Sequence, residues 1–168
     1  MTASGRYVPT EMKMKKAKQR MVLLLATGGG VGLAPAAPGT FGSLVGLALC
    51  FLLSRLDFLL AFLSVIVLIF LAVPICAAAE NLLGKTDPGA VVIDEIAGMA
   101  VSLVGIDFGL LTALAGFGLF RLFDIAKPFP IGYLEKRFAG GVGIVIDDVA
   151  AGVLVNLILR SAMALARL

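Results

Sequence analysis

The sequence predicts an all-α fold, a multi-pass membrane helical bundle with short helices and a structured loop rich in glycine and proline. Of its 168 residues, 60% are hydrophobic and 15% are charged, whereas about a quarter of an ordinary soluble domain is charged. Neither residues 21–54 nor residues 58–79 contain a charged side chain. As a helix, the second stretch would be about 33 Å long, which matches the hydrocarbon core of a bilayer.

One domain is expected, because 168 residues are too few for two separate hydrophobic cores. We expect residues 1–20 to be a basic, disordered N-terminal arm and residues 21–168 to be a single membrane-embedded domain. Six of the fourteen basic residues lie in this arm: Arg6, Lys13, Lys15, Lys16, Lys18 and Arg20. A basic start before apolar residues also resembles a secretory signal, but Gly28–Gly30 interrupts the apolar run and a second run follows. The arm is therefore expected to stay in the cytosol and to fix the orientation of the chain.

The first half of the chain alternates between loops and apolar helices. Residues 28–42 are rich in glycine and proline, so we expect an apolar structured loop at the membrane face instead of a regular helix. Helices are expected over residues 43–54 and 58–79. Farther along, Asp87 followed by Pro88 predicts a helix start, with Asp87 as the N-cap.

The apolar stretch 96–120 carries Asp107 at its centre. Because a lone aspartate at mid-bilayer costs several kcal/mol, residues 106–109 are expected to be a turn between two short helices. Such a hairpin places segments 80–95 and 121–148 on the same side of the membrane, so that their carboxylates can meet. A single span would separate them.

In the last part of the chain, Pro128 and Pro130 are expected to end the preceding helix, and residues 140–143 to form a flexible glycine turn. A final helix is expected from Asp147 to the C-terminus. Arg160 interrupts its apolar pattern, so it either faces a partner or extends its charged end toward water. Five helices would then leave both polar segments in the cytosol and the C-terminus outside.

Two adjacent acidic pairs, Asp94-Glu95 and Asp147-Asp148, lie beside apolar sequence, and Asp124 lies between them along the chain. Carboxylate oxygens without imidazole or thiolate ligands favour Mg²⁺ over zinc or copper, and the chain has no histidine. Favourable interaction with a helix dipole would explain one such pair by itself. The two pairs together with Asp124 favour a metal site.

Arg121, Asp124 and Lys127 recur at every third position, so at least Arg121 and Asp124 share a helix face. Arginine binds phosphate oxygens through two parallel N–H groups, and lysine acts as a point charge. A local ion pair beside a lysine that reaches water would explain the same spacing.

The segment Gly39-Thr40-Phe41-Gly42-Ser43 supplies backbone N–H groups and two hydroxyls just before an expected helix. This arrangement suits an anion, although packing turns have the same composition. It is not a Walker loop, because no lysine follows the final glycine.

Taken in order, four segments resemble the phosphatidylglycerophosphatase A family. They are PGTFGSL at 38–44, DP at 87–88 through DE at 94–95 with Gly98, FRLFDIAKPFPI at 120–131, and GGVGI at 140–144 through DD at 147–148 with Ala151-Gly152. One departure is Val145, where a larger, methionine-like residue is expected. The resemblance implies an all-α fold and Mg²⁺-dependent removal of the terminal phosphate from phosphatidylglycerophosphate, which gives phosphatidylglycerol.

The residues and this resemblance together lead to a set of expected roles. Mg²⁺ is the expected cofactor, with Asp94, Glu95, Asp147 and Asp148 as its ligands. The expected catalytic residues are Asp94, Asp124, Arg121 and Lys127; Asp124 would orient or deprotonate water, or attack phosphorus itself. The expected substrate-binding residues are Gly39, Thr40, Ser43, Arg121 and Lys127.

The expected partners are a phospholipid substrate and a membrane, with no nucleic acid, and the sequence does not determine the oligomeric state. The expected location is the bacterial cytoplasmic membrane, with the active site facing the cytoplasm. Two other functions are considered. A CDP-alcohol phosphotransferase would need an Asp-Gly…Ala-Arg start on one Asp-rich helix, which the chain lacks. A cation or proton transporter could use membrane carboxylates as a relay, but such proteins often carry internal repeats and none is visible.

Overall fold

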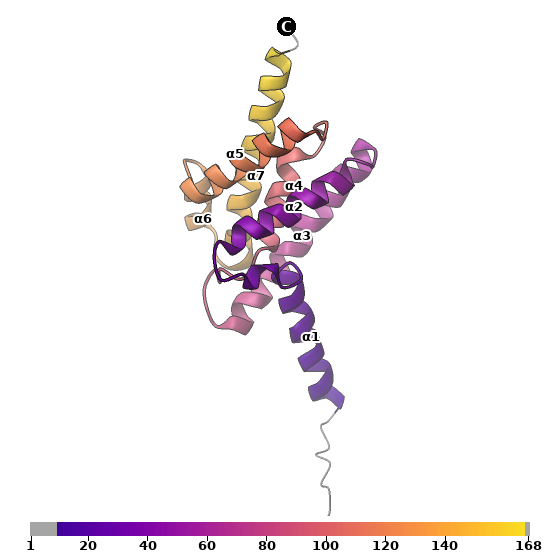
Figure 1. Ribbon diagram of the computed structural model, residues 1–168. Helices are drawn as coiled ribbons and strands as arrows, with labels where there is room; N and C mark the ends of the chain where they lie inside the picture. Colours follow the sequence, from indigo (N-terminus) through magenta and orange to yellow (C-terminus); the bar gives the residue numbers. More distant parts are fainter. Residues whose placement is uncertain (1–9, 167–168) are drawn as a thin grey trace, which may run out of the picture.

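The computed structural model describes residues 10–166 and contains only helices within that range (Figure 1). The all-α prediction is therefore confirmed for the described residues. In order, the elements are α1 (Thr10–Ala26), the 3-10 helix η1 (Val31–Leu33), α2 (Pro38–Leu53), α3 (Phe58–Leu83), α4 (Ile93–Leu103), α5 (Leu110–Ala126), α6 (Ile131–Arg137) and α7 (Gly140–Leu165).

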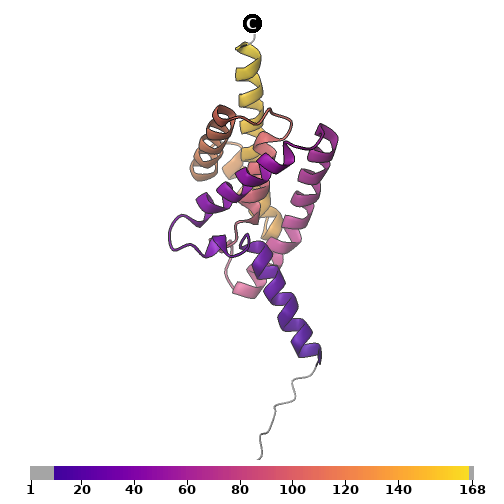
Figure 2. The ribbon, with the colours of Figure 1, turned by 45° about the vertical axis from the view of Figure 1, so that its right-hand side comes forward.

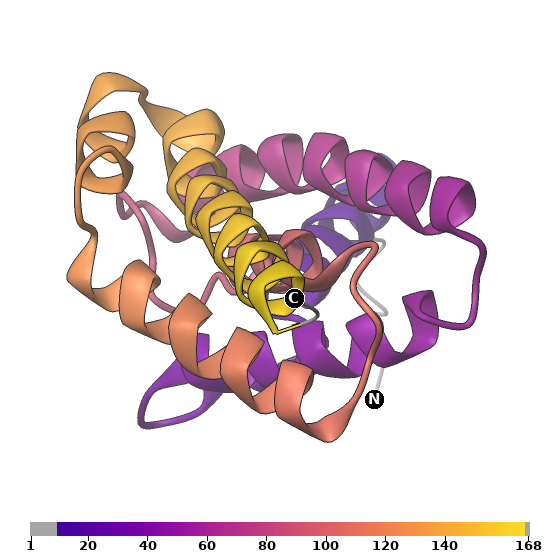
Figure 3. The same cartoon turned by 90° about the horizontal axis from the view of Figure 1, so that it is seen from above.

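Helix α4 is the centre of the structure. Every residue of α4 except Glu95 is buried, and α4 packs against α2, α3, α5 and α7. Viewed from above, these four helices surround it (Figure 3). A central helix this apolar is expected to be covered on all sides.

The two ends of the structure differ. Helix α1 projects from one end of the body, and the last turns of α7 project from the opposite end (Figures 1 and 2). The C-terminal part of α1 packs against α3, where Ala26 joins a core cluster with Ala72, Cys76 and Ala79. Only α3 and α7, among the described helices, are long and apolar enough to cross a membrane by length and composition. That the chain crosses a membrane several times remains a prediction.

The hairpin predicted around Asp107 is confirmed. Helix α4 ends at Leu103 and α5 begins at Leu110, with Asp107 exposed in the turn between them. Helix α7 holds this turn in place, because Arg160 donates hydrogen bonds to the carbonyl oxygens of Val104 and Gly105 at 3.1 and 3.0 Å. Asn156 also donates to the Val104 carbonyl, at 3.0 Å, so two side chains of α7 bind carbonyl groups at the end of α4.

Two helix starts were predicted too late. Helix α2 begins at Pro38 instead of residue 43, because proline suits the first helical position, where no N–H partner is needed. Helix α7 begins at Gly140 instead of Asp147, so residues 140–143 are helical and not a flexible turn. Packing of the buried Gly141 and Gly143 overrides the weak helix propensity of glycine.

The predicted N-cap at Asp87 is wrong. Asp87 has a φ of 45° and lies outside any helix. Helix α4 instead starts at Ile93, after Val92, whose N–H donates to the carbonyl oxygen of Ala26 at 2.8 Å. A tertiary contact with α1 therefore sets this boundary.

Three further features of the helices differ from the prediction. Residues 10–20, expected to be part of a disordered arm, are helical in α1, and residues 1–9 lie outside the described residues. Helix α3 continues to Leu83, where Gly84 caps it in a left-handed conformation. The short helix α6 was not predicted. The described chain has seven α-helices where five were expected.

Candidate active site

Three carboxylates from two helices meet at one end of the bundle. Asp94 and Glu95 lie in the first turn of α4, and Asp148 lies in α7. Ligand oxygens from these three residues all lie within 4.8 Å of one another. Segments 80–95 and 121–148 therefore come together, as the hairpin predicted.

This cluster has buried oxygen atoms without partners. Asp94 and Asp148 are buried, and one oxygen of each residue, with one of Glu95, lacks a hydrogen-bond partner. A buried, unpaired carboxylate oxygen is costly unless a cation or a donor compensates it. The donor set consists of carboxylate oxygens alone, which suits a hard divalent cation such as Mg²⁺.

The same burial shifts the acid strength of these groups. Burial raises the pKa of Asp94 well above its usual range, and the adjacent charge of Glu95 raises it further. Burial also raises the pKa of Glu95 to about 7, and the charge of Asp124 acts in the same direction. Burial and neighbouring charges therefore favour the neutral carboxyl groups, and a bound cation would favour the charged ones.

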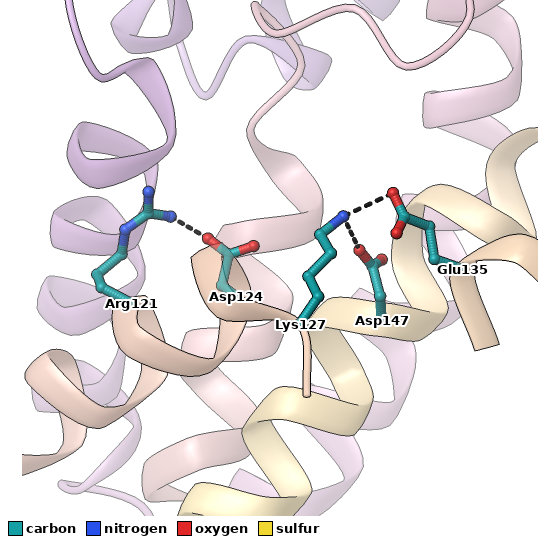
Figure 4. Close-up of polar contacts among 5 residues, drawn as sticks. All are labelled: Arg121, Asp124, Lys127, Glu135 and Asp147. Atoms are coloured by element: carbon teal, nitrogen blue, oxygen red, sulfur yellow. Dashed lines mark hydrogen bonds and ion pairs between the residues drawn. The ribbon is translucent and has the colours of Figure 1, made fainter. Parts of the chain in front are cut away.

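Lys127 connects three elements beside this cluster. It caps the end of α5, and its ammonium group lies 2.7 Å from Glu135 Oε1 on α6 and 2.8 Å from Asp147 Oδ2 on α7 (Figure 4). Burial lowers the pKa of Lys127, but these two hydrogen bonds outweigh burial and raise it above its usual range. Asp147, expected among the metal ligands, is thus the partner of a lysine and lies outside the group of three.

Arg121 and Asp124 form an ion pair on one face of α5, as their spacing predicted (Figure 4). Both side chains are largely buried. The Nε of Arg121 has no hydrogen-bond partner among the described residues. This buried N–H group is thus left without an acceptor.

A cavity of about 380 Å³ opens onto this group of charges. Six predicted site residues line it: Asp94, Glu95, Asp124, Lys127, Asp147 and Asp148. Three further acidic residues of the lining were not predicted as site residues: Glu80, Asp87 and Glu135. Glu135 lies in the charged run Glu135-Lys136-Arg137, which has the composition of an ordinary exposed helix face, so the sequence carried no signal for it.

The glycine-rich segment approaches the site at Gly39. A Cβ at Gly39 would lie 2.3 Å from Glu95 Oε1 and 3.1 Å from Arg121 Nη1, so only glycine leaves room for both groups. Thr40 is half-buried, and Ser43 is fully buried and donates its hydroxyl to the Gly39 carbonyl at 2.8 Å. Neither Thr40 nor Ser43 is among the residues that line the cavity.

Comparison with known proteins identifies the family. The family model of phosphatidylglycerophosphatase A matches residues 24–163. The chain belongs to the phosphatidylglycerophosphatase A family. The predicted resemblance is thereby confirmed, and so is the predicted enzyme class, a phosphatase. Membership in this family overturns the transporter and the phosphotransferase alternatives.

Several individual relatives are similar over most of the chain. A phosphatidylglycerophosphatase A of Escherichia coli K12 is 39% identical over 132 residues, which cover 78% of this chain and 77% of that protein. One from Haemophilus influenzae is 42% identical over 132 residues, covering 77% and 81%. A Bacteroides thetaiotaomicron protein with the provisional name phosphatidylinositol-3-phosphatase is 41% identical over 140 residues, covering 78% and 86%. No solved structure matches the chain significantly.

Proposed function

We propose that this phosphatidylglycerophosphatase A family member hydrolyses the terminal phosphate of phosphatidylglycerophosphate in a Mg²⁺-dependent reaction, which gives phosphatidylglycerol and phosphate. One observation carries the proposal: two buried carboxylates and one half-buried carboxylate of α4 and α7 converge on a cavity that Lys127 also lines. Relatives named for this activity support the choice of substrate.

Asp94, Glu95 and Asp148 would hold the Mg²⁺ ion. Their unpartnered oxygens supply the hard ligands that this ion prefers. When bound, Mg²⁺ supplies positive charge that neutralises phosphate and stabilises the leaving oxygen. Asp147 lies outside the group of three, and its Oδ2 accepts a hydrogen bond from Lys127 while its Oδ1 is buried without a partner. Its expected role as a metal ligand remains a prediction.

The remaining polar groups act on the phosphate and on water. Lys127 lines the cavity and keeps one ammonium donor for a phosphate oxygen. Arg121 is not among the lining residues, and we propose that it adds positive charge near the phosphate through its ion pair with Asp124. Asp124 lines the cavity beside Arg121, where it either orients the attacking water or attacks phosphorus itself. Quenching a turnover of substrate labelled with ³²P at the terminal phosphate distinguishes these roles, because only attack by Asp124 leaves the phosphoryl group covalently bound to the protein before water releases it.

We further propose that α3 and α7 cross the bacterial cytoplasmic membrane and that the cavity faces the cytoplasm. In the most apolar part of α3, only 17% of the residues are buried within the chain, so its apolar surface requires another cover. The cavity lies at the C-terminal end of α3, the end against which the basic helix α1 packs. Placement of α1 on the cytoplasmic side agrees with the positive-inside rule.

Phosphatidylinositol 3-phosphate is a second candidate substrate. The Bacteroides thetaiotaomicron relative supports it through its provisional name. Both lipids carry a phosphate monoester on a polar headgroup, so the same charged groups suit either one. A direct comparison of the two lipids at equal concentration decides which is hydrolysed faster.

The test measures phosphate release from both lipids by the purified, detergent-solubilised protein. We expect Mg²⁺-dependent hydrolysis of phosphatidylglycerophosphate that stops when the metal is chelated and resumes when Mg²⁺ is added. Asp148→Asn should lower turnover by about 100-fold or more, because it removes a ligand of the Mg²⁺ ion whose positive charge would stabilise the transition state. Asp107→Asn is the matched control, since Asp107 is exposed in the turn between α4 and α5.

The outcomes separate the parts of the proposal. Hydrolysis that continues at full rate with a chelator would exclude the metal assignment. An active Asp148→Asn variant would exclude the proposed ligand set. Faster hydrolysis of phosphatidylinositol 3-phosphate would make that lipid the preferred substrate in place of phosphatidylglycerophosphate.

A further inference from the structure

We propose that Glu135 is a positioning residue, which holds Lys127 in place to bind the substrate phosphate. This inference rests on the function proposed above. The residue lies on α6, outside the two acidic pairs and outside the predicted site. Its carboxylate lies 2.7 Å from the Lys127 ammonium, the shorter of the two contacts that this ammonium makes.

The backbone at Lys127 fixes where its side chain starts. Lys127 has a φ of 43°, a left-handed conformation that residues other than glycine rarely adopt, and Pro128 follows directly. From this point the side chain extends to α6 and α7 (Figure 4). Two of the three ammonium donors bind carboxylates, which leaves one donor for a ligand in the cavity.

A single anchor would hold the ammonium loosely. Lysine has a flexible four-carbon side chain, so one contact to Asp147 would let the charge move over a wide arc. Asp147 lies on the long helix α7, and its side chain is 8% exposed. Glu135 approaches from a different element, the short helix α6. Two contacts from two elements restrict the ammonium to one position.

The charge of Glu135 is otherwise unfavourable at this place. The cavity is already lined by Asp94, Glu95, Asp124, Asp147 and Asp148, and a further carboxylate repels an anionic phosphate. The side chain of Glu135 is 36% exposed, so an ion pair there contributes little to folding stability by itself. Its effect on the position of Lys127 compensates for the repulsion.

A double-mutant cycle tests the inference on the full-length protein with the lipid substrate. It compares the wild-type protein, Glu135→Gln, Lys127→Met and the double variant. We expect Glu135→Gln to raise KM about tenfold with a smaller change in kcat, because the loss of one charged hydrogen bond loosens phosphate binding. In the Lys127→Met background the same change should alter KM by less than about twofold, because the residue acts through Lys127.

Three controls exclude a merely structural effect or a metal ligand. Glu135→Asp should restore part of the lost affinity, since it restores the charge. Lys136→Met, at an exposed neighbour on α6, should leave KM within about twofold of the wild-type value. The Mg²⁺ concentration for half-maximal activity and the thermal unfolding midpoint should be unchanged in Glu135→Gln.

Suppose that the wild-type protein is active and that Glu135→Gln raises KM by the same factor with Lys127 present and with Lys127→Met. This result would overturn the role of Glu135 and leave the proposed function standing. A changed Mg²⁺ requirement would show that Glu135 belongs to the metal site and would also overturn this positioning role. Absence of hydrolysis by the wild-type protein would overturn the proposed function, and this inference with it.

Discussion

At the scale of single residues, the first turn of α2 leaves space for the charged groups of the site. Gly39 has only a hydrogen where any other residue would meet the Glu95 carboxylate and the Arg121 guanidinium. The atom that an added Cβ would meet first is Oε1 of Glu95, which is the end of a flexible side chain and not backbone. A methyl group there would therefore displace Glu95 at little cost to the fold, but it would disturb the proposed metal site.

We therefore expect Gly39→Ala to lower turnover by at least about tenfold while the unfolding midpoint changes little. Alanine stabilises a helix relative to glycine by up to about 1 kcal/mol, which offsets the local crowding. Phosphate release and thermal unfolding, measured on the same sample, check both parts.

The matched control is Gly118→Ala in α5, where an added Cβ meets nothing within 4 Å. It should keep full activity and gain up to about 1 kcal/mol in stability. Equal activity of the two variants would contradict the steric role of Gly39.

At the scale of elements, the contact between α4 and α7 brings the carboxylates together. A Cβ at Gly152 of α7 would lie 2.3 Å from the carbonyl oxygen of Gly98 on α4, so the two backbones are in direct contact. Because Asp148 lies one helical turn before Gly152, this contact places it beside Asp94 and Glu95.

Gly152→Ala should lower both stability and activity, in contrast to Gly39→Ala. The new methyl group meets backbone, which cannot rotate away, so the helices must separate at a cost of about 1–3 kcal/mol. Chemical unfolding measures the first effect and phosphate release the second. A Gly152→Ala variant that is inactive but as stable as the wild-type protein would show that helix separation is not the cause.

At the scale of the whole molecule, the buried acidic cluster links folding to metal binding. Charged carboxylates this close repel one another in the absence of a cation. A ligand that binds only the folded state stabilises it by about 2.7 kcal/mol at 100 times its Kd. Mg²⁺ should therefore stabilise the protein even when no substrate is present.

We expect saturating Mg²⁺ to raise the unfolding midpoint by about 5–10 °C. Asp148→Asn should abolish this shift, and its metal-free form should be more stable than the metal-free wild-type protein, because one repelling charge is removed. Thermal unfolding in detergent with a Mg²⁺ titration measures both effects. A shift of equal size in Asp148→Asn would place the stabilising ion elsewhere.

The sequence by itself determined the helical class, the hairpin at Asp107, the family and most of the charges around the cavity. These features depend on apolar runs, on the cost of one buried aspartate and on residue types that can be recognised along the chain. Helix boundaries were less predictable: α4 starts where Val92 binds Ala26, a contact between distant segments.

Only the tertiary structure decided which charged groups each carboxylate lies beside. Asp147 and Asp148 are neighbours in sequence, yet α7 turns by about 100° between them, so Asp148 meets Asp94 and Glu95 while Asp147 meets Lys127. Glu135 became part of the site because α6 folds back against α7. The physical reason is that the chemistry of a carboxylate follows from its nearest charges, and those are set by packing between helices that are distant along the chain.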